Sequence, residues 1–457
     1  MPKALPTVFA SQALYWVSTM TKAVGRQARQ EAPVLHLLFV GTALTVALAG
    51  GFSLGTLLAL ARTGTWGLEG RWPAIAQAHG HAQLAGWAGL FIMGMAYRLV
   101  PRFASTPAVP LVPALASLVA TAGGLAVRVV GQPLATADAG RAVLATAAAL
   151  ELAGAVTFAS LLLPRLWAPL RQGRSYAPHL ATMVLWLLVV RSLGMSWALG
   201  SAANGVALLP FDRQQALHNL EMWGFVLAAV AGVSLRSVII FFGREAPGPR
   251  ATWGMWSLLN AGLCLYVLAA AWQTYAPGEG LVRAEALGYV LVGLGLAAPA
   301  IAIGPWRPPS RLRPTSRGAG VLVQMGMLWL LAGGLLLAVL GTIALAEGTP
   351  VAYARLDAAR HVLGVGTVTT MIMGMAYLVM PAFALARQEG EPYRWAVRLA
   401  LLLLPMATVM RAAGGWLAGD LKGADHLTAT AGVLAWLAVA AFAASLARAL
   451  RSGVRAA

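Results

Sequence analysis

Three histidines stand near the beginning of long apolar segments, at nearly equal steps along the chain. They are His81, His218 and His361, and the interval between the first two nearly equals the interval between the last two. A histidine buried in apolar surroundings has to be desolvated and therefore needs a partner. Neutral imidazole binds zinc, copper and haem iron. The histidines thus predict a metal or haem site, with hydrogen bonding between helices as the purely structural alternative.

The first of these segments contains two histidines, His79 and His81, in the sequence AQAHGHAQLAGWAGLF. Helical positions i and i+2 point about 200° apart, so the two side chains cannot ligate one iron from the same side. We expect one of them to face the helix bundle and the other to face a loop, a propionate or solvent. The sequence leaves open which of the two is the ligand.

The second segment, HNLEMWGF, places His218 and Glu221 three residues apart, on one helical face. Such a pair can bind a metal ion or relay protons, or it can be a hydrogen-bonded polar pair without further function. A bound haem would also bring two propionate groups, which need a cationic side chain nearby or a position at the membrane interface. Arg360, Arg411 and Arg191 lie in or beside apolar segments and are the candidate partners.

The segments that carry His81 and His361 end in related motifs, MGMAYRLVP and MGMAYLVMP. One constant offset in residue number pairs His81 with His361, Met93 with Met373, Tyr97 with Tyr377 and Pro101 with Pro381. Internal repetition dictates architecture, and His218 opens a fainter third copy. We therefore expect three pseudo-repeats of four helices, at about residues 35–163, 177–305 and 319–450.

The composition is that of an integral membrane protein. Apolar residues make up 59% of the chain, charged residues 11%, and the mean hydropathy is +0.73, far from the balance of soluble domains. A membrane-spanning helix needs about 20 apolar residues. Twelve segments qualify, and they predict an all-α polytopic domain over residues 35–457 in a lipid bilayer. They cover residues 35–60, 73–100, 108–131, 140–163, 177–202, 213–242, 251–274, 283–305, 319–346, 357–384, 393–418 and 426–450.

The net charge of +18 does not indicate nucleic-acid binding, because the basic residues lie in loops rather than on a face with interleaved aromatic residues. When alternate loops are assigned to opposite sides, 22 of the 33 lysines and arginines lie on the side of the N-terminus and 9 on the other. The positive-inside rule then places both termini, including the basic segment 1–34, on the cytoplasmic side of the membrane. We expect this membrane to be a bacterial-type inner membrane. The three histidines consequently share one layer near the outer ends of their helices.

The chain has a single cysteine, Cys264, which excludes an intrachain disulfide framework and a cysteine-ligated cluster. It also has no CxxCH motif for covalent haem attachment. The simplest cofactor is therefore haem b, with one or two haems per chain.

Twelve helices in three units, with histidines opening helices 2, 6 and 10 on the outer side, resemble the catalytic subunit of haem-copper oxidases and nitric oxide reductases. In that superfamily, histidines of helices 2 and 10 ligate a low-spin haem, and a second helix 10 histidine holds a high-spin haem. Copper or non-haem iron takes one histidine from helix 6 and two from helix 7. The resemblance implies that His361 and either His81 or His79 ligate haem, and that His218 ligates a second metal.

The chain departs from that superfamily at the binuclear centre. Its helix 7 sequence, ATWGMWSLLNAGLCLYVLAAAWQ, contains no histidine, and helix 10 contains one rather than two. The chain is more similar to NnrS-type membrane proteins, in which HxH opens an early helix and a later helix carries a single histidine, as in RHVLGVGTVTTMIMGMAY. Those proteins contain haem and copper and are associated with resistance to nitric oxide. The acidic residue that often follows their HxH is Ala82 here.

These patterns together predict a haem protein of haem-copper oxidase-like fold, NnrS-type, in nitric oxide handling or membrane electron transfer. The cofactor-binding candidates are His81, His361, His79, Arg411 and Arg360, and the metal candidates are His81, His361, His218 and Glu221. We expect one haem between helices 2 and 10, ligated by His81 and His361, with His218 and Glu221 at a second metal or ligand-access site. Nitric oxide or oxygen would be the ligand, a quinol or cytochrome the electron donor, and copper a further metal. One alternative is the catalytic subunit of a terminal oxidase or nitric oxide reductase with unusual ligands. The other is a secondary transporter, although transporters of this size generally repeat at half the chain.

Overall fold

The computed structural model describes residues 35–64, 66–68, 70–134, 137–273, 276, 278–312, 316–383, 394–418 and 421–456. Within these ranges every regular element is a helix, and twelve helices are long and apolar enough to cross a membrane. The spans are Leu35–Arg62, Trp72–Phe103, Leu111–Leu134, Asp138–Arg171, Ala177–Ala203, Phe211–Phe242, Pro249–Trp272, Glu279–Ile303, Arg317–Glu347, Tyr353–Val379, Arg394–Trp416 and Ala424–Ala449. The predicted all-α polytopic fold is confirmed, and the predicted N-terminal segment 1–34 lies outside the described residues.

Several spans are divided into α-helical and π-helical pieces. The first six spans contain η1 (Ala47–Gly51) and α2 (Phe52–Arg62); α3 (Trp72–His81), η2 (Ala82–Leu90) and α4 (Phe91–Phe103); α5 (Leu111–Ala126), η3 (Val127–Gly131) and α6 (Gln132–Leu134); α7 (Ala137–Arg171); α8 (Ala177–Ala203); and α9 (Phe211–Leu220), η4 (Glu221–Leu227), α10 (Ala228–Val233), η5 (Ser234–Val238) and α11 (Ile239–Phe242). The last six contain α12 (Pro249–Gln273); α13 (Glu279–Ile303); α14 (Arg317–Glu347); α15 (Tyr353–His361), η7 (Val362–Thr369) and α16 (Thr370–Phe383); α17 (Arg394–Trp416); and α18 (Ala424–Ala456).

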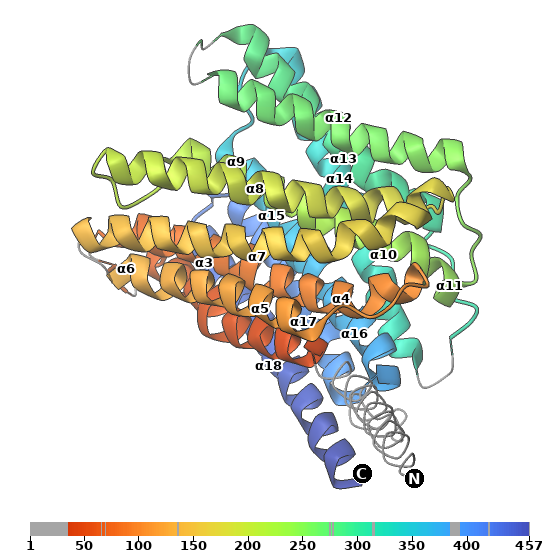
Figure 1. Cartoon of the computed structure of the whole chain (residues 1–457). Helices are drawn as coiled ribbons and strands as arrows, with labels where there is room; N and C mark the ends of the chain where they lie inside the picture. The colour runs from red at the N-terminus through yellow and green to blue at the C-terminus, as the bar shows by residue number, and fades with distance from the viewer. Residues whose placement is uncertain are drawn as a thin grey trace, which may run out of the picture.

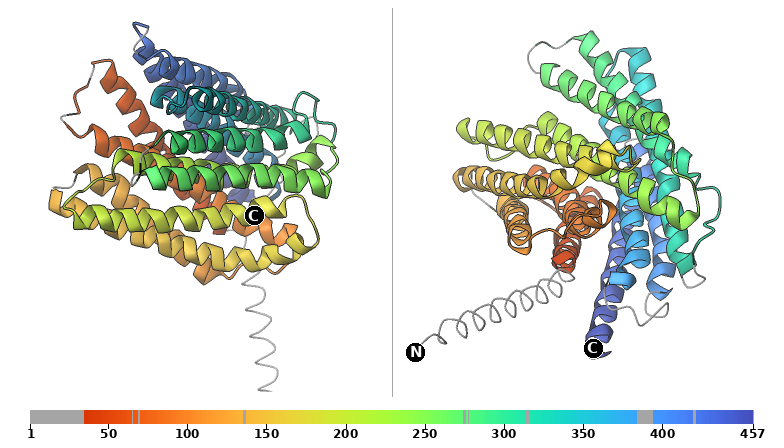
Figure 2. Two further views of the ribbon diagram at one scale, coloured as in Figure 1. Left: turned by 90° about the horizontal axis from the view of Figure 1, so that it is seen from above. Right: turned by 45° about the vertical axis from the view of Figure 1, so that its right-hand side comes forward.

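The long helices run side by side in one bundle (Figure 1), and the turned views of Figure 2 show the same bundle from other directions. Spans that follow one another in sequence pack together, as α12 does with α13, α13 with α14, and α17 with α18. The last helix, α18, also packs against α2 of the first span. The two ends of the described chain are therefore neighbours in the bundle, and the C-terminal part of α18 extends beyond it.

The three spans that carry the histidines form the centre of the bundle. In the most apolar window of the second, sixth and tenth spans, 83%, 78% and 78% of the residues are buried, against 33–61% in the other nine. Neighbouring helices cover nearly all faces of these three spans, whereas the other nine leave an apolar face that lipid can cover. The burial therefore recurs every four spans, with the same period as the histidines.

Each of these central spans contains a π-helical segment close behind its histidine. η2 begins directly after His81, η4 begins three residues after His218, and η7 begins directly after His361. The starts of η2 and η7, at Ala82 and Val362, are related by the same offset as the sequence motifs. π-helical turns widen the helix and occur frequently at functional sites. Their recurrence behind all three histidines fits a site there, although η1, η3 and η5 are π-helical without a histidine directly before them.

Candidate functional site

A cavity of about 580 Å³ lies among the central helices, beside the first turns of α3, α9 and α15. Its walls come from the first, second, sixth, tenth, eleventh and twelfth spans, and they are largely apolar and aromatic. The volume is within the range of about 300–1,000 Å³ that is typical of cofactor and small-molecule sites. Three histidines line this cavity, namely His79, His218 and His361.

His79 lies in α3 and is oriented by the first span. Its Nδ1 is 2.8 Å from the carbonyl oxygen of Gly51 and donates a hydrogen bond to it. A residue larger than glycine does not fit opposite the ring, because a Cβ at Gly55 would come within 2.5 Å of the His79 Cε1. Glycine at position 55 therefore lets the backbone of the first span approach the imidazole, and the carbonyl of Gly51 accepts its hydrogen bond.

His361 is oriented within its own helix, at the last residue of α15. Its Nδ1 donates to the carbonyl oxygen of Asp357, at 2.8 Å, one turn earlier. The Asp357 carboxylate lies 3.5 Å from the same nitrogen and accepts a hydrogen bond from Arg411 Nη2 at 2.5 Å. Arg411 thus holds the aspartate that flanks the imidazole, and both residues line the cavity.

His79 and His361 therefore share one tautomer. In each ring Nδ1 carries the proton, and Nε2 has no hydrogen-bond partner among the described residues. A histidine that ligates a metal through Nε2 usually donates its other N–H to a carbonyl or carboxylate, which fixes the ring and increases its basicity. Both side chains therefore line the cavity in the tautomer that ligation of a metal through Nε2 would require.

His81 does not line this cavity. It is 2% exposed, and its Nε2 lies 2.6 Å from Glu151 Oε1 on α7. The two side chains point in different directions, as expected for positions i and i+2. His79 faces the first span and His81 faces α7. The predicted pairing of His81 with His361 on one haem does not fit this geometry, because the ring nitrogen that would bind iron is hydrogen-bonded to a carboxylate outside the cavity.

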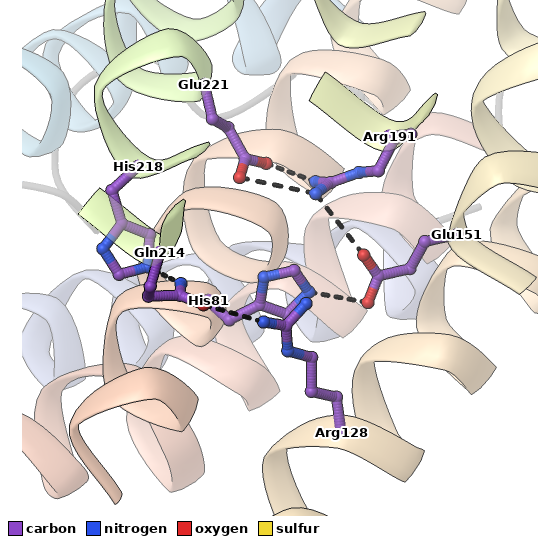
Figure 3. A network of polar contacts seen from close by, with 7 residues as sticks. All are labelled: His81, Arg128, Glu151, Arg191, Gln214, His218 and Glu221. Carbon is purple, nitrogen blue, oxygen red and sulfur yellow. Dashed lines mark hydrogen bonds and ion pairs between the residues drawn. The ribbon is translucent and has the colours of Figure 1, made fainter. Parts of the chain in front are cut away.

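His81 belongs to a buried ionic network that joins four spans (Figure 3). Arg191 on α8 bridges two carboxylates, with Nη1 3.4 Å from Glu151 Oε2 and Nη2 paired with Glu221 Oε1. All three side chains are at most 8% exposed. The carboxylates compensate the arginine, as a charge inside the membrane requires. Arg191 therefore acts here within the protein and does not reach the cavity.

His218 is held by a second set of hydrogen bonds that lies beside this network. Arg128 Nη2 donates to Gln214 Oε1 at 3.0 Å, which turns the amide nitrogen of Gln214 toward His218 Nε2, at 2.5 Å. Figure 3 shows this order of side chains. Nε2 of His218 accepts a hydrogen bond, so Nδ1 carries the proton.

The predicted second metal site at His218 and Glu221 does not fit these contacts. Glu221 forms an ion pair with Arg191, and Nε2 of His218 accepts a hydrogen bond from Gln214. Within the part of the chain that the structure describes, no group of three or more His, Cys, Asp or Glu side chains is arranged to hold a metal ion. Sequence reasoning missed the residues that orient the histidines, such as Gly51 and Gln214. No sequence signal marks them, since a backbone carbonyl is present at every residue and the glutamine is one of two neighbours, Gln214 and Gln215.

The fold and the cavity together define a polytopic, all-α membrane protein with a histidine-lined internal cavity. No family model matches the chain, and no curated protein matches it significantly.

Proposed function

We propose that the protein binds haem b in the histidine-lined cavity and acts in nitric oxide handling or membrane electron transfer, as an NnrS-type protein of haem-copper oxidase-like fold. One observation carries the proposal. His79 and His361 come from different central helices and line one cavity. In each ring Nδ1 donates a hydrogen bond to a backbone carbonyl, and Nε2 has no hydrogen-bond partner among the described residues. Two such imidazoles are what a bis-histidine haem requires.

The other residues of the cavity fit the same cofactor. The walls around the histidines are apolar, with Trp87 and Met222 among them, and would exclude water from a macrocycle. Arg411 lies at the cavity surface, paired with the aspartate that flanks His361, and is the candidate partner for a carboxylate of such a cofactor. The haem would supply one-electron redox chemistry and an iron that binds nitric oxide or oxygen when one imidazole is displaced.

The proposal includes a cellular setting. The excess of basic residues on the side of the N-terminus supports an inner membrane location with both termini in the cytoplasm. The histidine layer then faces the outer side, where a quinol or a cytochrome would reduce the haem. Quantification of copper and iron in one purified sample would measure whether copper accompanies the haem.

The test is the haem content of detergent-purified protein, measured as the pyridine haemochrome and the Soret absorbance. We expect the wild type to contain haem b, and the variants His79→Phe and His361→Phe to lose most of it. His81→Gln is the matched control, because glutamine can still donate to Glu151 and should leave the haem content unchanged.

Wild-type protein without a Soret band, or an unchanged spectrum in both His79→Phe and His361→Phe, contradicts the proposal. Loss of haem in His81→Gln together with its retention in His79→Phe would instead support ligation by His81.

A further inference from the structure

Arg360 is a buried cation that forms no ion pair in the described part of the chain, and its guanidinium carbon lies 5.9 Å from the centre of the Tyr353 ring. It lines the cavity and is 7% exposed. Its Nε donates to Asn219 Oδ1 at 2.7 Å and its Nη1 donates to Gln215 Oε1. Both partners are neutral amides of α9, and Nη2 has no hydrogen-bond partner among the described residues.

The other two arginines of the cavity differ from Arg360 in this respect. Arg62 pairs with Asp425 at 2.8 Å, and Arg411 pairs with Asp357 at 2.5 Å. An uncompensated charge inside a membrane protein is costly and is retained where it has a function. The unsatisfied nitrogen and the missing counter-ion both indicate that Arg360 binds an anionic group from the cavity.

His218 supplies a second donor beside this arginine. Both residues line the cavity, and the two amides that anchor Arg360, Gln215 and Asn219, stand three residues before and one residue after His218 on α9. Because Gln214 occupies Nε2, the proton is on Nδ1, which has no hydrogen-bond partner among the described residues. Gly80 allows this placement, since a Cβ there would overlap the His218 ring.

We propose that Arg360 and His218 form a binding site for a small oxyanion of the class of nitrite or formate. A guanidinium edge and an imidazole N–H offer the charge and the two donors that such an anion accepts. The donors belong to the α9 side of the cavity, where Gln215 and Asn219 anchor the arginine. His79, by contrast, is anchored to the first span and His361 to Asp357 within α15. The anion site therefore does not use the histidines of the proposed haem site.

The test is anion-dependent thermal stabilisation of the detergent-purified full chain at constant ionic strength. We expect formate and nitrite to raise the Tm of the wild type in a saturable manner, with chloride as the inactive control, because a ligand that binds only the folded state stabilises it. Arg360→Gln should weaken the apparent affinity at least about tenfold, since it removes a charged hydrogen-bond donor. His218→Phe should weaken it by a smaller factor, and Arg62→Gln should leave it unchanged.

Arg360→Gln is expected to fold, because it removes an unpaired buried charge, so its Tm without anion should equal or exceed that of the wild type. An Arg360→Gln variant that responds like the wild type, or a wild type that does not respond or responds equally to chloride, overturns the proposal. The same anion titration is repeated with protein loaded with haemin or with haemin dimethyl ester, which lacks free carboxylates. If haemin abolishes the anion response and the ester does not, the anion is the carboxylate of the cofactor, and a free-oxyanion site is overturned. The anion-dependent change in Tm can also be measured on protein without haem. A failure of haem binding is therefore distinguishable from a failure of the anion site.

Discussion

At the scale of single residues, the position of the His79 ring depends on the missing side chain of Gly55 and on the backbone carbonyl of Gly51. A Cβ at Gly55 would lie 2.5 Å from Cε1 and 2.9 Å from Nδ1 of the ring. The ring cannot simply turn away, because its Nδ1 donates to the carbonyl of Gly51, one helical turn earlier. A side chain at Gly55 would therefore displace the imidazole or break that hydrogen bond.

We accordingly expect Gly55→Ala to weaken haem binding by about tenfold or more, since overpacking of this kind typically costs about 1–3 kcal/mol. The measurement is a haemin titration followed at the Soret band. Gly41→Ala in the same span is the matched control, because a Cβ there meets nothing within 4 Å. Equal haem affinities in the two variants would show that the Gly55 contact does not position the ligand.

The buried network gives a second prediction at this scale. Glu221→Ala would leave Arg191 with only its 3.4 Å contact to Glu151. Breaking a buried ion pair from one side typically costs about 3–5 kcal/mol, because the other charge remains buried. The expected result is a clearly lower unfolding midpoint in a detergent-denaturant titration. Asp138→Ala is the control, because its ion pair with Arg141 is exposed and contributes little, and a similar loss in both variants would refute the prediction.

The sequence favours His81 over His79 as the partner of His361 without deciding between them, and in the structure His79 is the one that lines the cavity with His361. The angle between positions i and i+2 follows from helix geometry alone, so the divergence of the two side chains was predictable. Which side each one faces depends on the rotation of α3 about its axis, and this is set by packing against the first span and α7. The partners, the Gly51 carbonyl and Glu151, are 28 and 70 residues away from their histidines, beyond the reach of any local pattern.

At the scale of helices, the repeated motif MGMAY serves packing. Tyr97 donates or accepts a hydrogen bond with Ser117 at 2.8 Å, and Tyr377 does the same with Ser445 at 3.1 Å. Phe158 and Phe442 pack edge-on against Tyr97 and Tyr377, at ring-centroid distances of 5.3 Å and 5.2 Å respectively. The motif thus holds two central spans against their neighbours at the ends that lie away from the histidines. The histidines are at the opposite ends of these spans.

Close helix contacts elsewhere depend on glycine, and they give a third prediction. A Cβ at Gly334 of α14 would lie 2.7 Å from the carbonyl oxygen of Gly293 on α13. Because small residues let helix backbones approach closely in membranes, Gly334→Ala should separate the two helices and lower the Tm. Gly254→Ala in α12 gains the same helix propensity of about 1 kcal/mol without a neighbour within 4 Å. We therefore expect an unchanged or higher Tm for Gly254→Ala, and a Gly334→Ala variant that is equally stable would contradict the packing argument.

The spans themselves were predictable, because hydropathy over about 20 residues determines where a helix crosses the membrane. The fifth span, for example, was expected at 177–202 and is found at Ala177–Ala203. The π-helical segments were not predicted. Their hydrogen-bond register depends on how neighbouring helices pack around residues such as Gly86 and Gly366, where a Cβ would meet Val46 and Trp329. The constant offset between the two MGMAY motifs was visible beforehand, but it carries no information about helix register.

At the scale of the whole molecule, the cavity approaches one end of the bundle. The first residues of the three central spans, Trp72, Phe211 and Tyr353, line it and are 37%, 62% and 49% exposed. Phe211 and Tyr353 also contact each other, with ring centroids 5.1 Å apart. With both termini in the cytoplasm, as we propose from the distribution of basic residues, this end lies on the outer side of the membrane. A ligand or electron donor would therefore approach from outside the cytoplasm.

The orientation can be tested by labelling single cysteines in intact cells. In a Cys264→Ser background, we expect a membrane-impermeant maleimide to modify Thr349→Cys, in the connection between α14 and α15. It should spare Gln172→Cys, in the connection between α7 and α8, until the membrane is permeabilised. Both native residues are exposed, so a difference in labelling reports the side of the membrane and not burial. Thr349 lies shortly before Tyr353 at the cavity mouth, and the reverse labelling pattern would therefore mean that the cavity opens to the cytoplasm and that its redox partner is a cytoplasmic one.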